Sequence, residues 1–275
     1  MVGTQCCISE SQQVASGQGV RTLEVKPGCI LTVVPSAMDV PDSCVRCAWA
    51  LMGGVPPTPN PLNPKQCLRR RQLAFGSAYS FGQQRVKAGA VVPDLVKLCI
   101  AHSCEAAPSF GADPAWYTGA HVNWYDGGAA GIGRHQDYGE DGAPIFSYTF
   151  LVDPCEGKRA LRTFRVFDSR AAADPLVCVP LEHGMLVVMH GPNFQDPRLG
   201  AWHDVPPAPG KAFRESRRIN VTVRGWRGAA AVRGDVASAD AASADAAGVP
   251  VKVKGGARAQ GAAQQVGAAQ KMARR

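Results

Sequence analysis

The amino-acid sequence predicts an α+β fold with a mainly β core, a double-stranded β-helix (jelly roll) with flanking N-terminal helices. From residue 121 onward, short apolar runs recur between Gly, Pro and Asp residues: HVNWY, PIFSYTFLV, LRTFRVFD, MLVVMH and RINVTVRGW. Strands at this spacing are typical of sandwiches and barrels. Two helical patterns precede these runs. Hydrophobic residues make up 45% of the 275 residues and charged residues 19%, which supplies one sizeable core.

The N-terminal part of the chain alternates loose and regular segments. Residues 1–22 are rich in Ser and Gln, and we expect them to be loose. The run CILTVV at 29–34 predicts a strand, and residues 41–52, which begin at Pro41, predict a short helix. The run VPPTPNPLNP at 55–64 predicts a loop, because neither a helix nor a central strand accommodates so many prolines.

A second helix is predicted over residues 93–104. Its apolar positions recur at helical spacing and form one stripe, made of Leu95, Leu98, Cys99 and His102. We expect both helices to pack on the β core.

The last segment, residues 228–275, has the composition of a disordered tail. It is rich in Ala and Gly, repeats ASADA at 237–241 and 242–246, and contains no aromatic residue. Such a segment buries too little apolar surface to offset the entropy of ordering. Its basic residues outnumber its acidic ones. We therefore expect a disordered basic tail after a single domain at 23–227.

The charge balance and the N-terminus suggest partners and location. The chain carries 30 Lys and Arg residues against 22 Asp and Glu, a net charge of +8, which favours a polyanionic partner. The N-terminus MVGTQCCISESQQ has neither a basic nor an apolar signal region, and the longest apolar run, 47–55, is too short to span a membrane. We expect an intracellular protein of the cytoplasm or nucleus, a monomer that is neither secreted nor membrane-bound.

The strand predicted at 218–224 carries an unusual polar face. Because side chains alternate between the faces of a strand, Arg218, Asn220, Thr222 and Arg224 lie on one side. One interpretation is a solvated face. The other is a carboxylate-binding wall inside a barrel, since a buried guanidinium requires an anionic partner and pairs with carboxylates bidentately.

A candidate metal site begins at His135 and Asp137, whose side chains project to the same side of an extended backbone. With a distant second histidine they would form the two-histidine, one-carboxylate set of non-haem Fe(II) oxygenases. Alone, this spacing is common by chance. The candidates for the second histidine are His102, His121, His183, His190 and His203. His183 and His190 flank an apolar strand, which favours a structural role for them.

Taken in order, these motifs resemble the AlkB family of Fe(II)- and 2-oxoglutarate-dependent dioxygenases. The resemblance is carried by NWY at 123–125, GIGRHQDYGEDGAPIFS at 131–147, LEHGMLVVMHGP at 181–192, WH at 202–203 and RINVTVR at 218–224. It covers residues 63–227. It implies a jelly roll, an Fe(II) cofactor, 2-oxoglutarate and O₂ as co-substrates, and a nucleic acid (DNA or RNA) as the partner.

The resemblance also implies a role for each matching residue. The implied iron ligands are His135, Asp137 and His203. The residues implied to hold the distal carboxylate of 2-oxoglutarate are Asn123, Tyr125 and Arg218, and those near its iron-chelating end are Asn220 and Arg224.

A nucleotide-recognition lid is implied at about 65–87, around RRRQLAFGSAYSF at 69–81. The implied phosphate contacts are Arg69, Arg70 and Arg71, and the implied base contacts are Phe75, Tyr79 and Phe81. The alternative is that these aromatic residues pack into the core and the arginines cap a solvated loop.

The sequence departs from the family pattern just after the implied metal-binding carboxylate. Where many relatives carry an acidic residue two positions after Asp137, this chain has Gly139. The nearest acidic residues, Glu140 and Asp141, remain candidates for contact with the substrate, so the base preference is open.

The expected function is oxidative dealkylation of N-methylated bases in DNA or RNA, with release of formaldehyde, succinate and CO₂. One alternative is the same oxygenase chemistry on a protein side chain. Another is a nucleic-acid-binding module with an inactive site, against which the intact His135, Asp137, His203, Arg218 and Arg224 argue.

Overall fold

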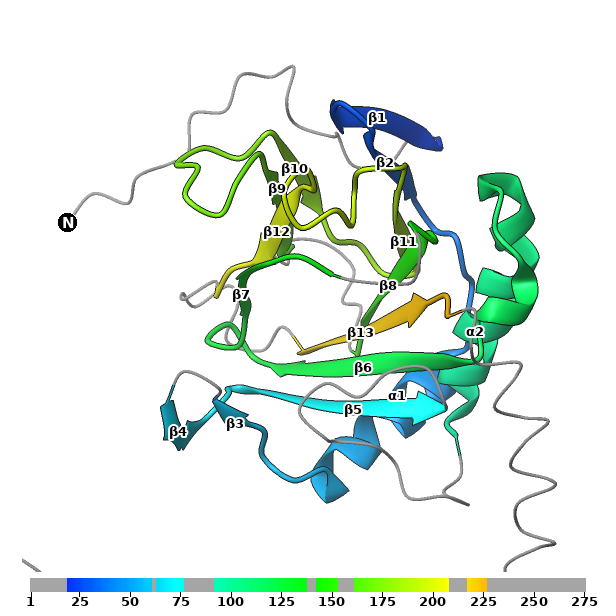
Figure 1. Ribbon diagram of the computed structural model, residues 1–275. Coiled ribbons are helices and arrows are strands. Elements are labelled where there is room, and N and C mark those ends of the chain that lie inside the picture. The colour runs from blue at the N-terminus through cyan, green and yellow to red at the C-terminus, as the bar shows by residue number, and fades with distance from the viewer. Residues whose placement is uncertain are drawn as a thin grey trace, which may run out of the picture. The chain divides into compact units, whose positions relative to one another are not determined.

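Two antiparallel sheets face each other across a cavity and form the β core (Figure 1). The computed structural model describes residues 19–60, 63–76, 92–137, 142–152, 161–207 and 217–226. The architecture confirms the mainly β jelly roll with helices from the N-terminal half. Most of the segment expected to be loose at 1–22, and the tail expected at 228–275, lie outside the described residues.

The major sheet has seven strands in the order β1-β2-β11-β8-β13-β6-β5. Its strands are β1 (Arg21–Lys26), β2 (Cys29–Val34), β5 (Arg70–Gly76), β6 (Gly119–Asp126), β8 (Ile145–Leu151), β11 (Met185–His190) and β13 (Arg217–Arg224). β13 lies between β6 and β8, so that Asn220 is opposite Asn123 on one side and Thr149 on the other. The sheet therefore brings the polar face of β13 beside the polar positions of β6.

The minor sheet has four strands in the order β10-β9-β12-β7. Its strands are β7 (Ile132–His135), β9 (Thr163–Phe167), β10 (Val177–Pro180) and β12 (Trp202–Val205). A separate hairpin pairs β3 (Pro59–Asn60) with β4 (Asn63–Cys67). The expected loop over 55–64 is confirmed at 55–58 and wrong at 59–60 and 63–64, since short edge strands tolerate proline where central strands do not.

Two helices, α1 (Asp42–Ala50) and α2 (Asp94–Ala106), pack on the major sheet (Figure 1). Each begins directly after a proline with extended backbone, Pro41 (ψ 137°) or Pro93 (ψ 144°). Each has an aspartate at its first position, where the positive end of the helix dipole favours a carboxylate. Short 3₁₀ turns follow at η2 (Leu51–Gly54), η3 (Ala107–Phe110) and η4 (Pro114–Trp116).

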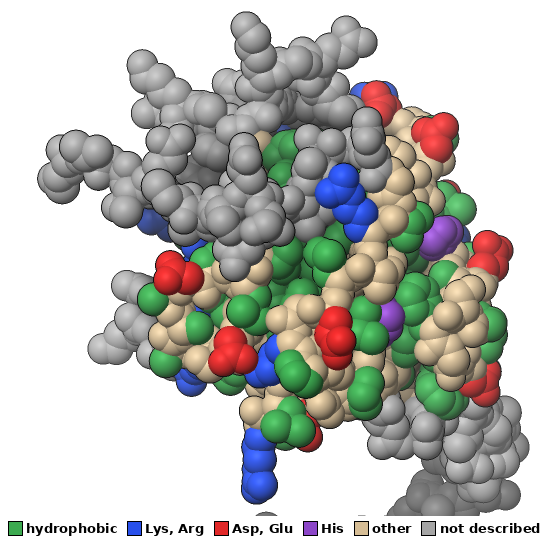
Figure 2. Space-filling model, turned by 90° about the horizontal axis from the view of Figure 1, so that it is seen from above, with side chains coloured by type: hydrophobic (Ala, Val, Ile, Leu, Met, Phe, Trp, Pro, Cys, Tyr) green, Lys and Arg blue, Asp and Glu red, His purple; other side chains and the backbone are tan. Residues whose placement is uncertain are grey.

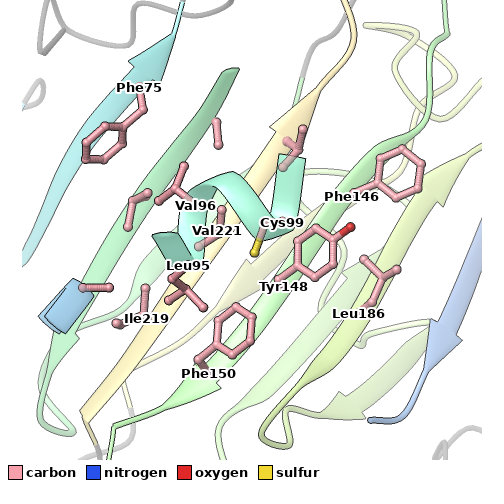
Figure 3. Packing of buried hydrophobic residues seen from close by; sticks show 14 of the residues in the cluster. Phe75, Leu95, Val96, Cys99, Phe146, Tyr148, Phe150, Leu186, Ile219 and Val221 are labelled. Carbon is pink, nitrogen blue, oxygen red and sulfur yellow. The ribbon is translucent and has the colours of Figure 1, made fainter. Parts of the chain in front are cut away.

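The larger apolar core lies between α2 and the major sheet (Figure 3). Leu95 and Cys99 of α2 are fully buried with Ile219 and Val221 of β13. Burying one large aliphatic side chain contributes about 1.5–3 kcal/mol, so this layer anchors the central strand of the sheet. The polar face of β13 consequently turns away from the helices and toward the cavity.

The buried stripe predicted for the second helix is correct at Leu95 and Cys99 and wrong at Leu98. Leu95 and Cys99 are buried, but Leu98 is 42% exposed, and Val96 and Ser103 are buried in its place. The buried face is therefore rotated from the predicted one.

No helix in the described ranges is long and apolar enough to cross a membrane.

A second apolar cluster joins the two sheets. Leu31 of β2 and Val187 of β11 meet Val166 of β9 and Val179 of β10 in the interior. This cluster fills the space between the sheets on the side of β2, β9, β10 and β11. The cavity occupies the rest of the space between the sheets, where β5, β6 and β13 face β7 and β12.

Candidate metal centre

Two histidines and one aspartate meet where β7 and β12 pair. His135 ends β7 and stands directly opposite His203 of β12 in the strand register, and Asp137 follows two residues after His135. His135 Nε2 lies 3.6 Å from Asp137 Oδ1, and His203 Nε2 lies 3.6 Å from Asp137 Oδ2. The three ligand atoms lie within 4.8 Å of one another. Cross-strand pairing thus selects His203 as the second histidine.

His135 is held in the protonation state that binds a metal. Burial, and then the neighbouring His203, lower the pKa of His135 to about 4, so its ring is neutral at pH 7. His135 Nδ1 lies 2.8 Å from the carbonyl oxygen of Gly133, and a proton donated there leaves Nε2 with its lone pair toward Asp137.

The aspartate is held ionised. Burial, the largest single influence, raises the pKa of the Asp137 carboxyl, but Arg224, His203 and His135 together outweigh it and keep this pKa well below its usual range. Arg224 Nη2 is 2.6 Å from Asp137 Oδ1. Two imidazoles and an ionised carboxylate are the donor set of a divalent metal with open coordination positions.

The metal-ligand set opens into a cavity of about 330 Å³ between the sheets. Its major-sheet wall carries the residues that the sequence predicted for 2-oxoglutarate: Asn123, Tyr125, Arg218, Asn220 and Arg224. The structure therefore brings these five residues and the three metal-ligand candidates into one cavity. The polar face of the strand at 218–224 is the wall of a barrel interior and is not solvated.

Arg218 has the surroundings of an anion site. It is 2% exposed, and its guanidinium stacks over the ring of Tyr125, 4.8 Å from the centroid. Nη2 donates to Thr149 Oγ1 at 3.1 Å, whereas Nη1 is buried without a hydrogen-bond partner. An unmet donor on a buried guanidinium calls for an anion, and the distal carboxylate of 2-oxoglutarate fits that need.

Amide side chains form the floor between Arg218 and the metal-ligand set. Asn123 Nδ2 donates to Asn220 Oδ1 at 3.4 Å, and Asn220 Nδ2 donates to Ser147 Oγ at 2.9 Å. Thr222 Oγ1 also donates to Asn220 Oδ1, at 3.1 Å. These bonds run across β6, β13 and β8 and fix the orientation of both amides.

The segment predicted as a lid is partly a strand of the sheet, because Arg70–Gly76 forms β5. Arg69 is exposed, as a phosphate contact requires. Arg70 is 8% exposed and points into the cavity, because alternation along β5 turns it inward. Arg71, on the opposite face, donates to the carbonyl oxygens of Met52 (2.7 Å) and Val55 (2.8 Å). Arg70 is therefore buried, and Arg71 is half-buried with its guanidinium held by backbone carbonyl oxygens.

The prediction that Phe75 contacts a base is wrong. Phe75 is 3% exposed and belongs to the core under the helices, which is the alternative of a packed aromatic residue. Tyr79, Phe81, Glu140 and Asp141 lie outside the described residues.

Several residues of the cavity were not predicted to line it, and His121 was considered only as a candidate second histidine. Gln72 of β5, His121 of β6 and Phe164 of β9 all line it. The alternation of RRRQLAFG places Arg70 and Gln72 on one side of a strand, and that pattern could have found them. Burial and the charge of Arg224 lower the pKa of His121 to about 3, so this side chain is neutral at pH 7.

A jelly roll with two histidines and one carboxylate in the wall of an arginine-lined cavity defines a non-haem iron oxygenase that uses a 2-oxo acid. The comparison with known families agrees. The model of the 2OG-Fe(II) oxygenase superfamily matches residues 53–224, and the chain belongs to that superfamily. Its enzymes are dioxygenases that use Fe(II), 2-oxoglutarate and O₂.

The chain also matches solved structures. A prolyl-4-hydroxylase from Pseudomonas putida is 16% identical, with a TM-score of 0.44, and the match covers 71% of this chain and 92% of that one. No curated protein sequence matches the chain.

Proposed function

We propose that this oxygenase is AlkB-like and removes N-alkyl groups from bases in DNA or RNA. For an N-methyl group the products are the unmodified base, formaldehyde, succinate and CO₂. The order of the site residues supports this proposal, since the segments NWY, HQD, WH and RINVTVR all contribute to one cavity.

The observation that carries the proposal is the charge of the cavity. Among the described residues that line it, four are arginines, and Asp137 is the one carboxylate. An Fe(II) ion and a 2-oxoglutarate dianion cancel each other's charge, so the positive surplus persists when both are bound. By contrast, basic and acidic side chains are interspersed on the face of the molecule shown in Figure 2. A surplus gathered at the reaction site favours a polyanionic substrate.

The side chains of this chain have separate tasks in the reaction. His135, Asp137 and His203 would hold the iron, and Arg218 with Tyr125 would hold the distal carboxylate of the co-substrate. The bound iron and 2-oxoglutarate supply the oxidation of a substrate C–H bond by O₂. The cavity walls position the N-alkyl group and exclude water. A base within a duplex reaches this cavity only by leaving the base stack.

A protein side chain is the second candidate substrate. The core position of Phe75 and the backbone contacts of Arg71 remove two residues on which the nucleic-acid lid was expected to rest. The same cavity chemistry serves either substrate.

The test is formaldehyde and succinate release from the iron-loaded full-length protein. We expect turnover of single-stranded oligonucleotides that carry one N-methylated base, and background release from methylated and proline-containing peptides. The matched control is His135→Ala, which should abolish succinate release with every substrate. Turnover of peptides alone would make the protein a protein hydroxylase. Oligonucleotide binding without succinate release from the parent protein would support the inactive module.

A further inference from the structure

Arg70 and Gln72 form a second polar wall of the cavity, on the edge strand β5. Both are buried, at 8% and 0% exposed, and both line the cavity. They are separated by one residue on a strand, so their side chains project to the same side. The neighbouring strand β6 places Asn123 directly opposite Gln72.

This wall is rich in hydrogen-bond donors that lack a charged acceptor. Arg70 Nε donates to Asn123 Oδ1 (3.2 Å), Nη1 to the Gly131 carbonyl oxygen (3.3 Å) and Nη2 to Gln72 Oε1 (3.4 Å). These three acceptors are neutral, and all three bonds are long. Gln72 Nε2 is buried without a hydrogen-bond partner. A guanidinium and a primary amide therefore present N–H groups to the cavity.

The co-substrate does not account for this wall. Arg218, Tyr125 and Thr149 already make an anion site on β13, β6 and β8. Arg70 and Gln72 belong to the next strand outward, beyond β6. Buried donors with unmet capacity favour a ligand that brings acceptors, and a buried positive charge disfavours a ligand that brings another positive charge.

We propose, on the basis of the proposed function, that Arg70 and Gln72 contact the acceptor edge of the target base and select neutral alkylated bases. N1-methylguanine and N3-methylthymine are neutral and keep carbonyl oxygens that accept hydrogen bonds. 1-Methyladenine and 3-methylcytosine are cations, and they meet the guanidinium of Arg70 as a like charge. This repulsion should lower kcat/KM for the cationic bases relative to the neutral ones.

The first measurement compares four single-stranded oligonucleotides of one sequence, each with one of these methylated bases. Formaldehyde release by the iron-loaded full-length protein gives kcat/KM for each. We expect the two neutral bases to exceed the two cationic bases by at least about tenfold. Equal rates, or faster turnover of the cations, would overturn the assignment and leave base dealkylation standing.

Variants of the wall test the cause of that preference. Gln72→Glu places a carboxylate beside Arg70 Nη2 and should shift the ratio toward the cationic bases by about tenfold or more. Arg70→Gln should shift it in the same direction. The charge-matched control is Lys97→Gln on α2, which removes an exposed positive charge outside the cavity and should leave the ratio unchanged.

Two further outcomes separate this proposal from others. If Arg70→Gln raises the KM for 2-oxoglutarate and leaves the base ratio unchanged, Arg70 acts only by positioning Asn123, and the proposal is wrong. If no methylated base releases formaldehyde while 2-oxoglutarate is still converted to succinate, the proposed function itself fails.

Discussion

Arg224 Nη2 lies 2.6 Å from Asp137 Oδ1, so the last residue of β13 is ion-paired with the carboxylate that faces both His135 and His203. The two side chains are only 6% and 12% exposed. Each partner of such a buried pair depends on the other, since either one alone would be an uncompensated charge. Arg224 of the major sheet thus orients the carboxylate of Asp137, which follows a strand of the minor sheet.

Removing this carboxylate should destabilise the protein before any metal is considered. We expect Asp137→Ala to lower the free energy of unfolding of the metal-free protein by about 3–5 kcal/mol, because the buried Arg224 loses its 2.6 Å ion pair with this carboxylate. Urea denaturation measures this. The control is Asp204→Ala, which should cost less, since its partner Arg165 is 31% exposed and reaches water. Adding Arg224→Met to Asp137→Ala should recover part of the loss, and equal losses in all three variants would contradict the argument.

Arg218 should control the affinity for 2-oxoglutarate. Arg218→Lys keeps the charge but loses the planar fork and the stack on Tyr125, so the KM for 2-oxoglutarate should rise. Arg218→Ala should lose on the order of 2–5 kcal/mol of binding free energy. Calorimetric titration of the metal-loaded protein with 2-oxoglutarate measures both. An unchanged affinity in the alanine variant would remove Arg218 from the co-substrate site.

His121 should make the protein sensitive to acid. Burial, and then the positive charge of Arg224, lower its pKa to about 3, whereas an unfolded histidine titrates near pH 6.5. Protonation therefore favours the unfolded chain. The stability from neutral His121 is complete above about pH 6.5 and is lost as the pH falls toward 3, by up to about 1.4 kcal/mol per pH unit.

Urea denaturation of the metal-free protein between pH 7 and pH 4 measures that slope. His121→Gln should flatten it, and the remaining slope includes His135, whose pKa is about 4. The same slope in parent and variant would show that His121 is not held neutral.

Arg71 should contribute to stability and Arg69 to nucleic-acid binding, although the two residues are near neighbours. Arg71→Ala removes donors from the carbonyl oxygens of Met52 and Val55 and should lower the free energy of unfolding by about 1–3 kcal/mol. It should leave the salt dependence of oligonucleotide binding unchanged. Arg69→Ala should leave stability unchanged and reduce the log–log salt slope by up to about 0.9 for duplex DNA. Fluorescence anisotropy at several salt concentrations measures the slope, and a reduced slope in Arg71→Ala would contradict this assignment.

The metal-ligand set was predictable because its signals are local. His135 and Asp137 need only an extended backbone to project to the same side. In RINVTVR, polar and apolar residues alternate from Arg218 to Arg224, as in a strand with one polar face. The choice of His203 rested on resemblance in order and spacing, and its physical basis is the register that pairs β12 with β7.

The wall on β5 was not predicted because its signal is ambiguous. Three consecutive arginines, Arg69–Arg71, are typical of a solvated segment, and only the pairing of β5 with β6 turns Arg70 inward. The same limit applies to α2, where Leu98 fits the helical period but the sheet beneath buries Val96 instead. Which side of an element meets the core is decided by its neighbours, and these lie far away in the chain.

β7 is an edge strand of its sheet, paired with β12 within the described residues, and each of the two strands carries one histidine of the site. An ion shared by His135 and His203 is consequently a cross-link between segments far apart in the sequence. A cross-link reduces the conformational entropy of the chain more when β7 and β12 are separated than when they are paired. Metal binding and the pairing of β7 with β12 therefore form one linked equilibrium. Removal of the ion should therefore weaken the pairing of β7 with β12 as well as the chemistry, and the metal-free protein should be cleaved faster by proteases than the metal-loaded protein.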